Sequence, residues 1–191
     1  MPIHLDLSVV VEYTHWERQK WHEWFQKQGD KTLEISVGPH GDGRFQTVGD
    51  LIRHIFGAEK RYIEWLSGRP LEQMTDLASI PTNSTEALFQ FGQQSRKGLK
   101  EFLETFPAED WDTLRDMKFP NSSLRARATP RKTVVHILLH EIRHWAQIGT
   151  LLRLNGLVDD LHDFIASPVM GGEWKREGKS PQARSPAGTG A

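Results

Sequence analysis

The sequence predicts an all-α protein, folded as an antiparallel four-helix bundle of the up-down-up-down type. Four long segments carry apolar side chains at helical spacing, and a glycine, a proline or a capping residue stands at most of their ends. The linkers between these segments are too short for another domain. A chain of 191 residues fills one core, so we expect a single domain over 1–170 and a flexible tail over 171–191, rich in Gly, Pro and charge.

The first two predicted helices have recognisable ends. The first has its large apolar residues on one face, at Val10, Tyr13, Trp21 and Trp24. It is expected to end at Gly29, because glycine commonly stops a helix. Thr47 and Asp50 give a capping-box-like start to the second helix, which is expected to end near Gly68.

A third helix is predicted over 84–106, although two internal glycines weaken its helical propensity. The next stretch, 107–129, has no helical repeat. It is expected to form a short hairpin around Pro120 and Asn121, between the third and fourth helices. The last helix is expected to begin at Pro130, whose fixed φ suits the first helical position.

Composition limits the partners and the metal ligands. The chain has 24 Lys and Arg against 25 Asp and Glu, so it offers no basic surface for nucleic acid or for an anionic membrane. No segment has the length and apolarity of a membrane span. The absence of cysteine excludes a disulfide, a thiolate metal site and a cysteine nucleophile, and it suits a cytoplasmic protein. A small-molecule substrate is expected, and a homodimer is left open.

Three histidines occur at four-residue intervals in the last predicted helix, at His136, His140 and His144. At about 100° per residue they fall within an arc of roughly 80°, on the face that Gln147 continues. Several polar rings on one inward face would have a substantial desolvation cost. A bound metal offsets this cost, and an i, i+4 pair of histidines has ligand spacing, so we predict a metal site.

The third ligand should come from another helix, since metal sites of this kind commonly use three protein ligands. His54 lies in the second predicted helix, roughly 10 Å from its start, and His140 roughly 15 Å into its own, a mismatch that stagger can absorb if the two helices run parallel. The predicted ligands are therefore His54, His140 and His144. Apart from His136, the remaining five histidines lie on a different helix face or at expected ends and loops: His4, His15, His22, His40 and His162.

The segments YTHWERQKW, FQTVGDLIRHIFGAEKRYIEWL and HILLHEIRHWAQIGTLLRLNG resemble the DinB-like family of metal-dependent proteins over roughly 5–166. The strongest part is the pattern HxxxHExxHxxQ together with the single histidine of the second helix. The resemblance implies a four-helix bundle and a divalent metal on His54, His140 and His144. The family usually has Arg and Gly where this chain has Trp145 and Ala146, so any pocket role of that arginine is in doubt here.

The motif HEIRH at 140–144 also satisfies the HExxH pattern of zinc metalloproteases. The metzincin form requires Gly at 147 and His at 150, where this chain has Gln147 and Thr150. A distant acidic ligand would have to come from one of three residues, Asp159, Asp160 or Asp163. Glu141 is about 100° from His140, so we expect it to point to a neighbouring helix or to solvent, as a salt bridge or surface charge. The bundle is favoured over the protease.

Four further residues have two interpretations each. Asp50 either accepts the second ring N–H of His54 or caps its helix. Gln147 and His136 flank the ligand pair and can bind a water or substrate, although His136 also suits a plain core position. Arg61 either binds a carboxylate or phosphate at the pocket mouth or is a solvated surface residue.

The leading functional hypothesis is an enzyme in which a three-histidine metal activates water or a thiolate against a small electrophilic substrate. Such a protein would be a hydrolase or, as the resemblance implies, a thiol S-transferase that uses a low-molecular-weight thiol. The metal can be Zn, Ni, Fe, Mn or Co, because three imidazoles suit all of them. The alternative is a metal-binding or stress-response protein without turnover, and a zinc metalloprotease is the third hypothesis.

Overall fold

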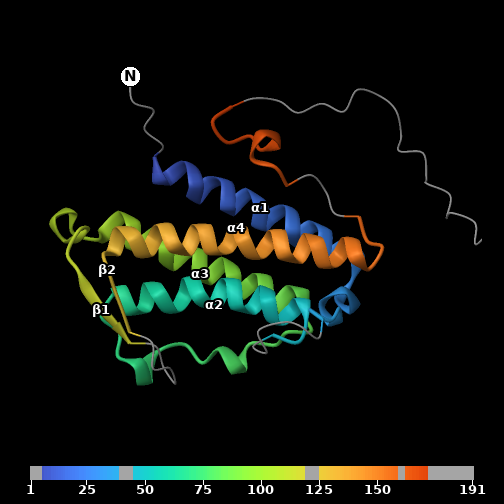
Figure 1. Ribbon diagram of the computed structural model, residues 1–191, viewed down its shortest axis with the longest axis horizontal. Helices are drawn as coiled ribbons and strands as arrows, with labels where there is room; N and C mark the ends of the chain where they lie inside the picture. Colours follow the sequence, from blue (N-terminus) through green and yellow to red (C-terminus); the bar gives the residue numbers. More distant parts are fainter. Residues whose placement is uncertain (1–5, 39–44, 119–124, 159–161, 172–191) are drawn as a thin grey trace, which may run out of the picture.

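The structure, a computed structural model, describes residues 6–38, 45–118, 125–158 and 162–171. Within these ranges four long α-helices lie along one another (Figure 1): α1 Leu7–Gln28, α2 Val48–Leu66, α3 Thr85–Thr105 and α4 Pro130–Leu154. The all-α prediction is confirmed in that the protein is mostly helical. None of the helices in the described ranges is long and apolar enough to cross a membrane.

Local capping explains where the helices begin and end. Thr47 and Asp50 form the predicted capping box at the start of α2. The hydroxyl of Thr129 accepts a hydrogen bond from the first turn of α4, and Pro130 occupies the first helical position. Gly29 ends α1 with a φ of 86°, which favours glycine. These ends are the ones the sequence predicts.

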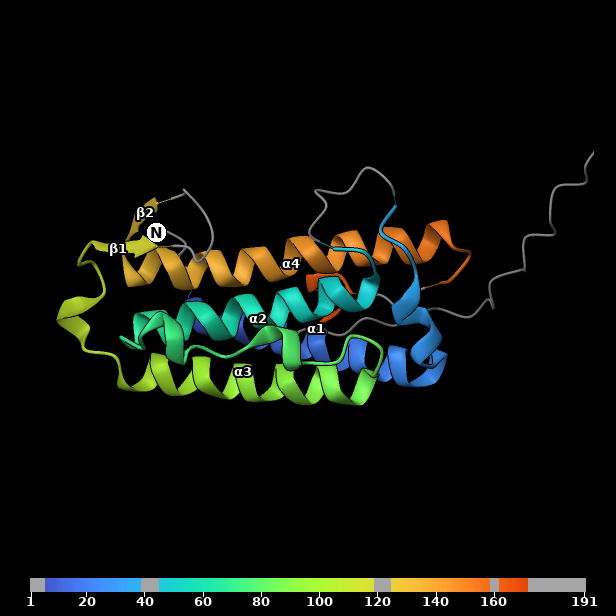
Figure 2. The ribbon, with the colours of Figure 1, turned by 90° about the horizontal axis from the view of Figure 1, so that it is seen from below.

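The helices run in a different order from the predicted one. α1 and α4 are parallel, because Arg18 contacts Glu141 and, further along both helices, Trp21 stacks on Trp145. α2 and α3 are also parallel, because their N-terminal halves share one apolar cluster and their C-terminal halves share another. The colours of Figures 1 and 2 show the same directions. The topology is up-down-down-up, so the up-down-up-down prediction is wrong.

The link from α2 to α3, residues 67–84, causes this difference. It contains two 3₁₀ turns, η2 Leu71–Gln73 and η3 Leu77–Ser79, and it returns along the whole of α2. Its contacts with α2 run in opposite order along the two segments: Thr75 with Glu64, Leu77 with Gly57, and Thr82 with Gly49. A Cβ on Gly49 would lie 1.9 Å from the Thr82 carbonyl oxygen, so this approach requires glycine.

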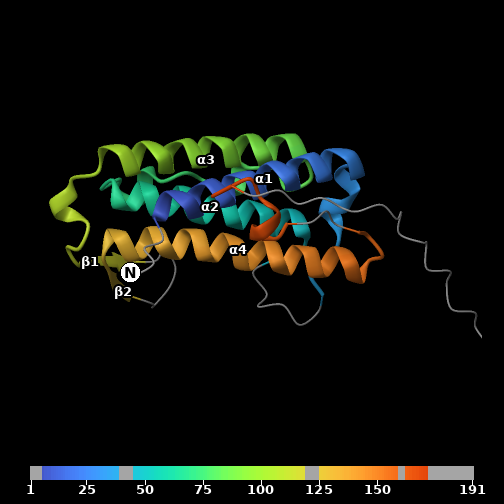
Figure 3. The ribbon, with the colours of Figure 1, turned by 90° about the horizontal axis from the view of Figure 1, so that it is seen from above.

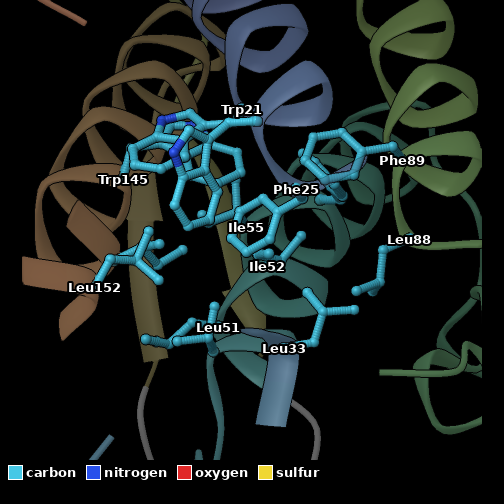
Figure 4. Close-up of a cluster of buried hydrophobic side chains, with 14 of the residues drawn as sticks. Trp21, Phe25, Leu33, Leu51, Ile52, Ile55, Leu88, Phe89, Trp145 and Leu152 are labelled. Atoms are coloured by element: carbon cyan, nitrogen blue, oxygen red, sulfur yellow. The ribbon is translucent and has the colours of Figure 1, made fainter. Parts of the chain in front are cut away.

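The core consists of two apolar clusters, one toward each end of the bundle. The larger contains Trp21, which stacks on Trp145 at a centroid distance of 5.3 Å. Figure 4 shows this pair above Ile55 and Ile52, beside Phe25. The smaller cluster combines residues of all four helices, including Val11, Ile63, Leu99, Phe102, Val134 and Leu138. Charged side chains lie buried between the two clusters, as described below.

A short antiparallel hairpin joins α3 to α4, as predicted. Its strands are β1 Arg115–Lys118 and β2 Arg125–Ala128, with Arg115 opposite Ala128. The predicted turn at Pro120 and Asn121 lies outside the described residues. After α4 the described segment 162–171 packs on α1, where the Tyr13 hydroxyl donates to the His162 carbonyl oxygen at 2.6 Å. The predicted tail lies outside the described residues from 172 onward.

Candidate metal centre

The three predicted ligands come together between α2 and α4. The Nε2 atom of His140 lies 2.9 Å from His54 Nε2 and 3.1 Å from His144 Nε2. One possible ligand atom from each ring lies within 4.8 Å of those of the other two. Among the described residues, this is the one group of three or more metal-binding side chains.

The relative direction of α2 and α4 determines how His54 reaches His140 and His144. α2 and α4 run antiparallel, since His54 contacts His140 while Tyr62, further along α2, contacts His136, earlier in α4. The expectation that these two helices run parallel is wrong, because the link 67–84 makes α3 parallel to α2, and the hairpin after α3 turns α4 back against both. His140 and His144 lie one helical turn apart on the same face, so a single side chain from α2 can reach both.

The protonation of the rings fits a bound cation. His144 Nδ1 lies 2.6 Å from Gln147 Oε1, and this hydrogen bond places the ring hydrogen on Nδ1, so that Nε2, which faces His140, carries the lone pair of a metal ligand. Burial, followed by the neighbouring His144 and His54, lowers the pKa of His140 to about 3. A single hydrogen on His140 Nε2 cannot be donated to both His54 Nε2 and His144 Nε2, whereas a cation between the three nitrogens would contact all of them. Three nitrogen ligands around a tetrahedral zinc ion stand about 3.3 Å apart, close to the spacing here.

Phe45 covers part of the centre, which the sequence reading missed. Its ring centroid lies 4.6 Å from that of His54 and 6.3 Å from that of His144. The backbone pairing of Ser36 with Thr47 holds this segment beside the first turn of α2. The sequence carries no local signal for this contact, because the residue directly before the Thr47 cap, where an apolar side chain commonly packs on the first turn, is Gln46.

The structure assigns different surroundings to the four residues that had two interpretations each. Gln147 contacts the His144 ring, so it acts on a predicted ligand directly. The carboxylate of Asp50 accepts from the backbone N–H groups of Gln46 and Thr47, which is the capping interpretation. Arg61 donates to the Thr75 carbonyl oxygen in the link 67–84, at 3.4 Å. His136 is exposed, and its ring centroid lies 5.5 Å from that of His140.

The described histidines outside the triad lie elsewhere. His22 stacks on Phe89 of α3 at 4.5 Å, and His15 contacts Gln19 on α1. His162 stacks on Trp21 at 4.0 Å. His4 and His40 lie outside the described residues.

Glu141 does not take the position of a protease base. Its carboxylate accepts hydrogen bonds from Arg18, from Arg96 at 2.7 Å and from the Trp145 indole at 3.2 Å. It points to neighbouring helices, as one predicted alternative stated. The expectation of a surface charge is wrong, because the side chain is 1% exposed. A carboxylate held by two arginines is a poor general base, and this geometry argues against the HExxH interpretation.

Each of the four helices contributes one side chain to a buried charged cluster, formed by Arg18, Glu59, Arg96 and Glu141. Arg18 lies 3.0 Å from Glu59, and Arg96 lies 3.1 Å from it. Burial alone would raise the pKa of Glu141, but Arg18 and Arg96 hold it below its ordinary value. The sequence reading missed this cluster, although Arg18 falls on the helix face of buried Val11 and Trp21, which was a usable signal.

Glu17, beside this cluster, carries a pH prediction. Burial, followed by the charge of Glu141, raises the pKa of Glu17 to about 8. Folding therefore favours the protonated acid, so its contribution to stability is present below the unfolded pKa and is lost as pH rises through 8. We expect Glu17→Gln to stabilise the protein by about 2–3 kcal/mol at pH 8 and by little at pH 4.5. Urea unfolding at both pH values measures this difference, and equal effects at both would contradict the raised pKa.

The fold and the three-histidine group between α2 and α4 define the class of this protein: a helical bundle with a candidate metal centre. The model of the DinB family matches residues 1–175, and the chain belongs to this family. A solved DinB-like protein from Bacillus cereus is 17% identical, with a TM-score of 0.58, over 79% of this chain and 93% of that one. A DinB-like protein from Bacillus subtilis is also 17% identical, with a TM-score of 0.49, over 80% of this chain and 96% of its own. No curated protein matches the chain.

Proposed function

We propose that this DinB-family protein is a divalent-metal-dependent enzyme that directs water or a thiolate at a small electrophilic substrate. The observation that carries the proposal is the convergence of three imidazole Nε2 atoms from α2 and α4. A divalent cation in such a site supplies Lewis acidity, which favours the deprotonated form of water or of a thiol.

The protein's own side chains supply the rest of the site. His54, His140 and His144 would hold the cation. Gln147 accepts the Nδ1 hydrogen of His144, which fixes the ring and directs its Nε2 lone pair toward the centre. Phe45 excludes water from the side of the centre that it covers. Ligand positions set by helices and outer-shell contacts favour a reproducible geometry.

A sulfur nucleophile must come from outside the chain. The sequence contains no cysteine, so a sulfur nucleophile has to be a low-molecular-weight thiol. Glu141 is engaged by two arginines and cannot act as the base that a peptidase requires. Attack by water gives a hydrolase and attack by a thiol gives an S-transferase, and both classes suit a small substrate.

The test is turnover that depends on the metal. We expect freshly purified protein to contain a divalent metal and to accelerate one of two reactions. These are the hydrolysis of an aryl ester and the substitution of chloride on a chloronitroaromatic compound by a low-molecular-weight thiol, with release of chloride and a proton. Chelation should abolish this activity and metal should restore it, because the uncatalysed nucleophile stays protonated near neutral pH. His54→Ala should lose the activity, while Lys132→Ala, at the exposed start of α4, should keep it.

A metal-replete protein that turns over neither substrate class would contradict the proposal that this protein is an enzyme. That outcome, together with retained metal, would favour the metal-binding protein without turnover. Peptide cleavage that disappears in a metal-replete Glu141→Gln protein would instead restore the metalloprotease hypothesis.

A further inference from the structure

The row of histidines on α4 extends one turn beyond the candidate metal ligands. His136 lies one helical turn before His140, near the end of α4 that follows the hairpin of β1 and β2 (Figure 3). Its ring centroid lies 5.5 Å from that of His140, compared with 4.3 Å between the rings of His140 and His144. The proposed function leaves this fourth imidazole without a role.

His136 differs from the neighbouring ligands in its exposure. His140 is 9% exposed and His144 is 4% exposed, whereas His136 is open to solvent. The His136 ring packs edge-on against Tyr62 at 5.4 Å, and no hydrogen bond joins it to another of the described residues. An exposed imidazole that no hydrogen bond holds can rotate and present either ring nitrogen to a species in solution.

The two ends of the metal centre have different coverings. At one end the Phe45 ring lies over His54 and His144, at centroid distances of 4.6 and 6.3 Å. At the other end the ring next to His140 is that of His136. A phenyl ring offers no ligand atom, whereas an imidazole does. A cation that approaches from solvent would therefore meet its first ligand at His136.

Local charge does not offer another means of capturing the cation. The candidate metal-binding group consists of three histidines and holds no carboxylate. Arg143, which is exposed on α4, adds a positive charge near His136 and His140. A hydrated cation must exchange its waters for protein ligands, and two histidines at i and i+4 have the spacing to hold it. Capture should therefore begin at a pair of imidazoles.

We propose that His136 and His140 form an entry position for the divalent metal. The two rings replace waters of the hydrated cation, and His54 and His144 then displace His136, while His140 stays a ligand throughout. The inference rests on the metal centre of the proposed function but not on turnover, because it concerns how the cation arrives. His136 is released once the other three histidines hold the cation, so its loss should change the rates of uptake and release rather than the affinity.

Uptake of Ni²⁺ by metal-free protein tests this role. We expect His136→Ala to slow both the uptake of Ni²⁺ and its release to an excess of a chromophoric chelator by at least about fivefold, and to leave the Kd within about twofold. His15→Ala removes an imidazole from α1 and should change neither rate. Unchanged rates in His136→Ala would overturn the proposal. A weaker affinity with an unchanged uptake rate would also overturn it, because His136 would then be a permanent ligand.

The entry position can also be isolated from the metal centre. The double variant His54→Ala/His144→Ala keeps only the pair of His136 and His140, and it should still bind one Ni²⁺ weakly. Addition of His136→Ala should weaken this residual binding at least about tenfold in a calorimetric titration. Circular dichroism verifies that both variants are folded. Equal Ni²⁺ binding by the double and the triple variant would show that the two histidines do not form a site.

These measurements distinguish the entry position from the proposed enzyme. Wild-type protein that takes up Ni²⁺ faster than His136→Ala but turns over no substrate would contradict the enzyme and support the entry position. Wild-type protein that binds no Ni²⁺ would overturn both the metal centre and its entry position.

Discussion

Glu141→Gln is expected to lower the free energy of unfolding by about 3–5 kcal/mol, because it leaves two buried arginines without one of their two carboxylate partners. Arg18 and Arg96 are 6% and 3% exposed, so water cannot replace the lost charge. Glutamine keeps the size of the side chain and offers a single oxygen. Urea unfolding at pH 7, followed by circular dichroism, measures the change.

Glu12→Gln is the matched control, since Glu12 is exposed on α1 and the same change there should cost less than about 0.5 kcal/mol. Replacement of all four cluster residues by apolar residues of similar volume should recover much of the loss, because the desolvation cost of the charges disappears with them. If Glu141→Gln lowers the free energy of unfolding by less than about 1 kcal/mol, the prediction is wrong, because a loss of that size is typical of an exposed ion pair.

The second large effect concerns the three histidines. Substitution of His54, His140 or His144 by alanine is expected to weaken metal binding by more than about 100-fold, since outer-shell changes alone cost about 10–100-fold. Removal of one ring leaves two protein ligands, whereas metal sites of this kind commonly use three. Metal content after purification and a competition titration with a chromophoric chelator measure the loss.

His22→Ala and His15→Ala are the matched controls, because both rings lie on the α1 side of the bundle. They should keep the full metal content. Stoichiometric metal in His54→Ala would overturn the ligand set. Equal losses in His54→Ala and His22→Ala would indicate a general loss of folding, which thermal unfolding would detect independently.

Much of the helical structure could be predicted because its determinants are local. The capping box at Thr47, the proline at 130 and the glycine at 29 act within one helical turn, and all three mark true helix boundaries. The hairpin between α3 and α4 follows from the lack of a helical repeat in the same way.

The directions of the helices depend on long-range packing and were predicted wrongly. The link 67–84 looks like a proline-punctuated turn, but its approach to α2 depends on small residues at Gly49 and Gly57, where it needs room. Nothing in the link itself states that it returns along α2. Helix direction is set by which apolar faces pack together, and this information is distributed over the whole chain.

The candidate site divides in the same way. His140 and His144 could be paired from their spacing alone, and His54 from the helix that carries it. Phe45 could not be placed, because its contact with the centre depends on the path of a loop. Glu141 was assigned to the wrong environment, since its two arginine partners come from α1 and α3, far away in the sequence.

The parallel pairing of α1 with α4 has a consequence for how the chain folds during synthesis. Arg18 on the first helix and Glu141 on the last are separated by 123 positions, so these partners meet only after α4 has left the ribosome. Until then, Trp21 lacks the Trp145 ring on which it stacks. Until α4 has emerged, the nascent protein therefore exposes both a charged side chain and an aromatic ring that the finished fold buries.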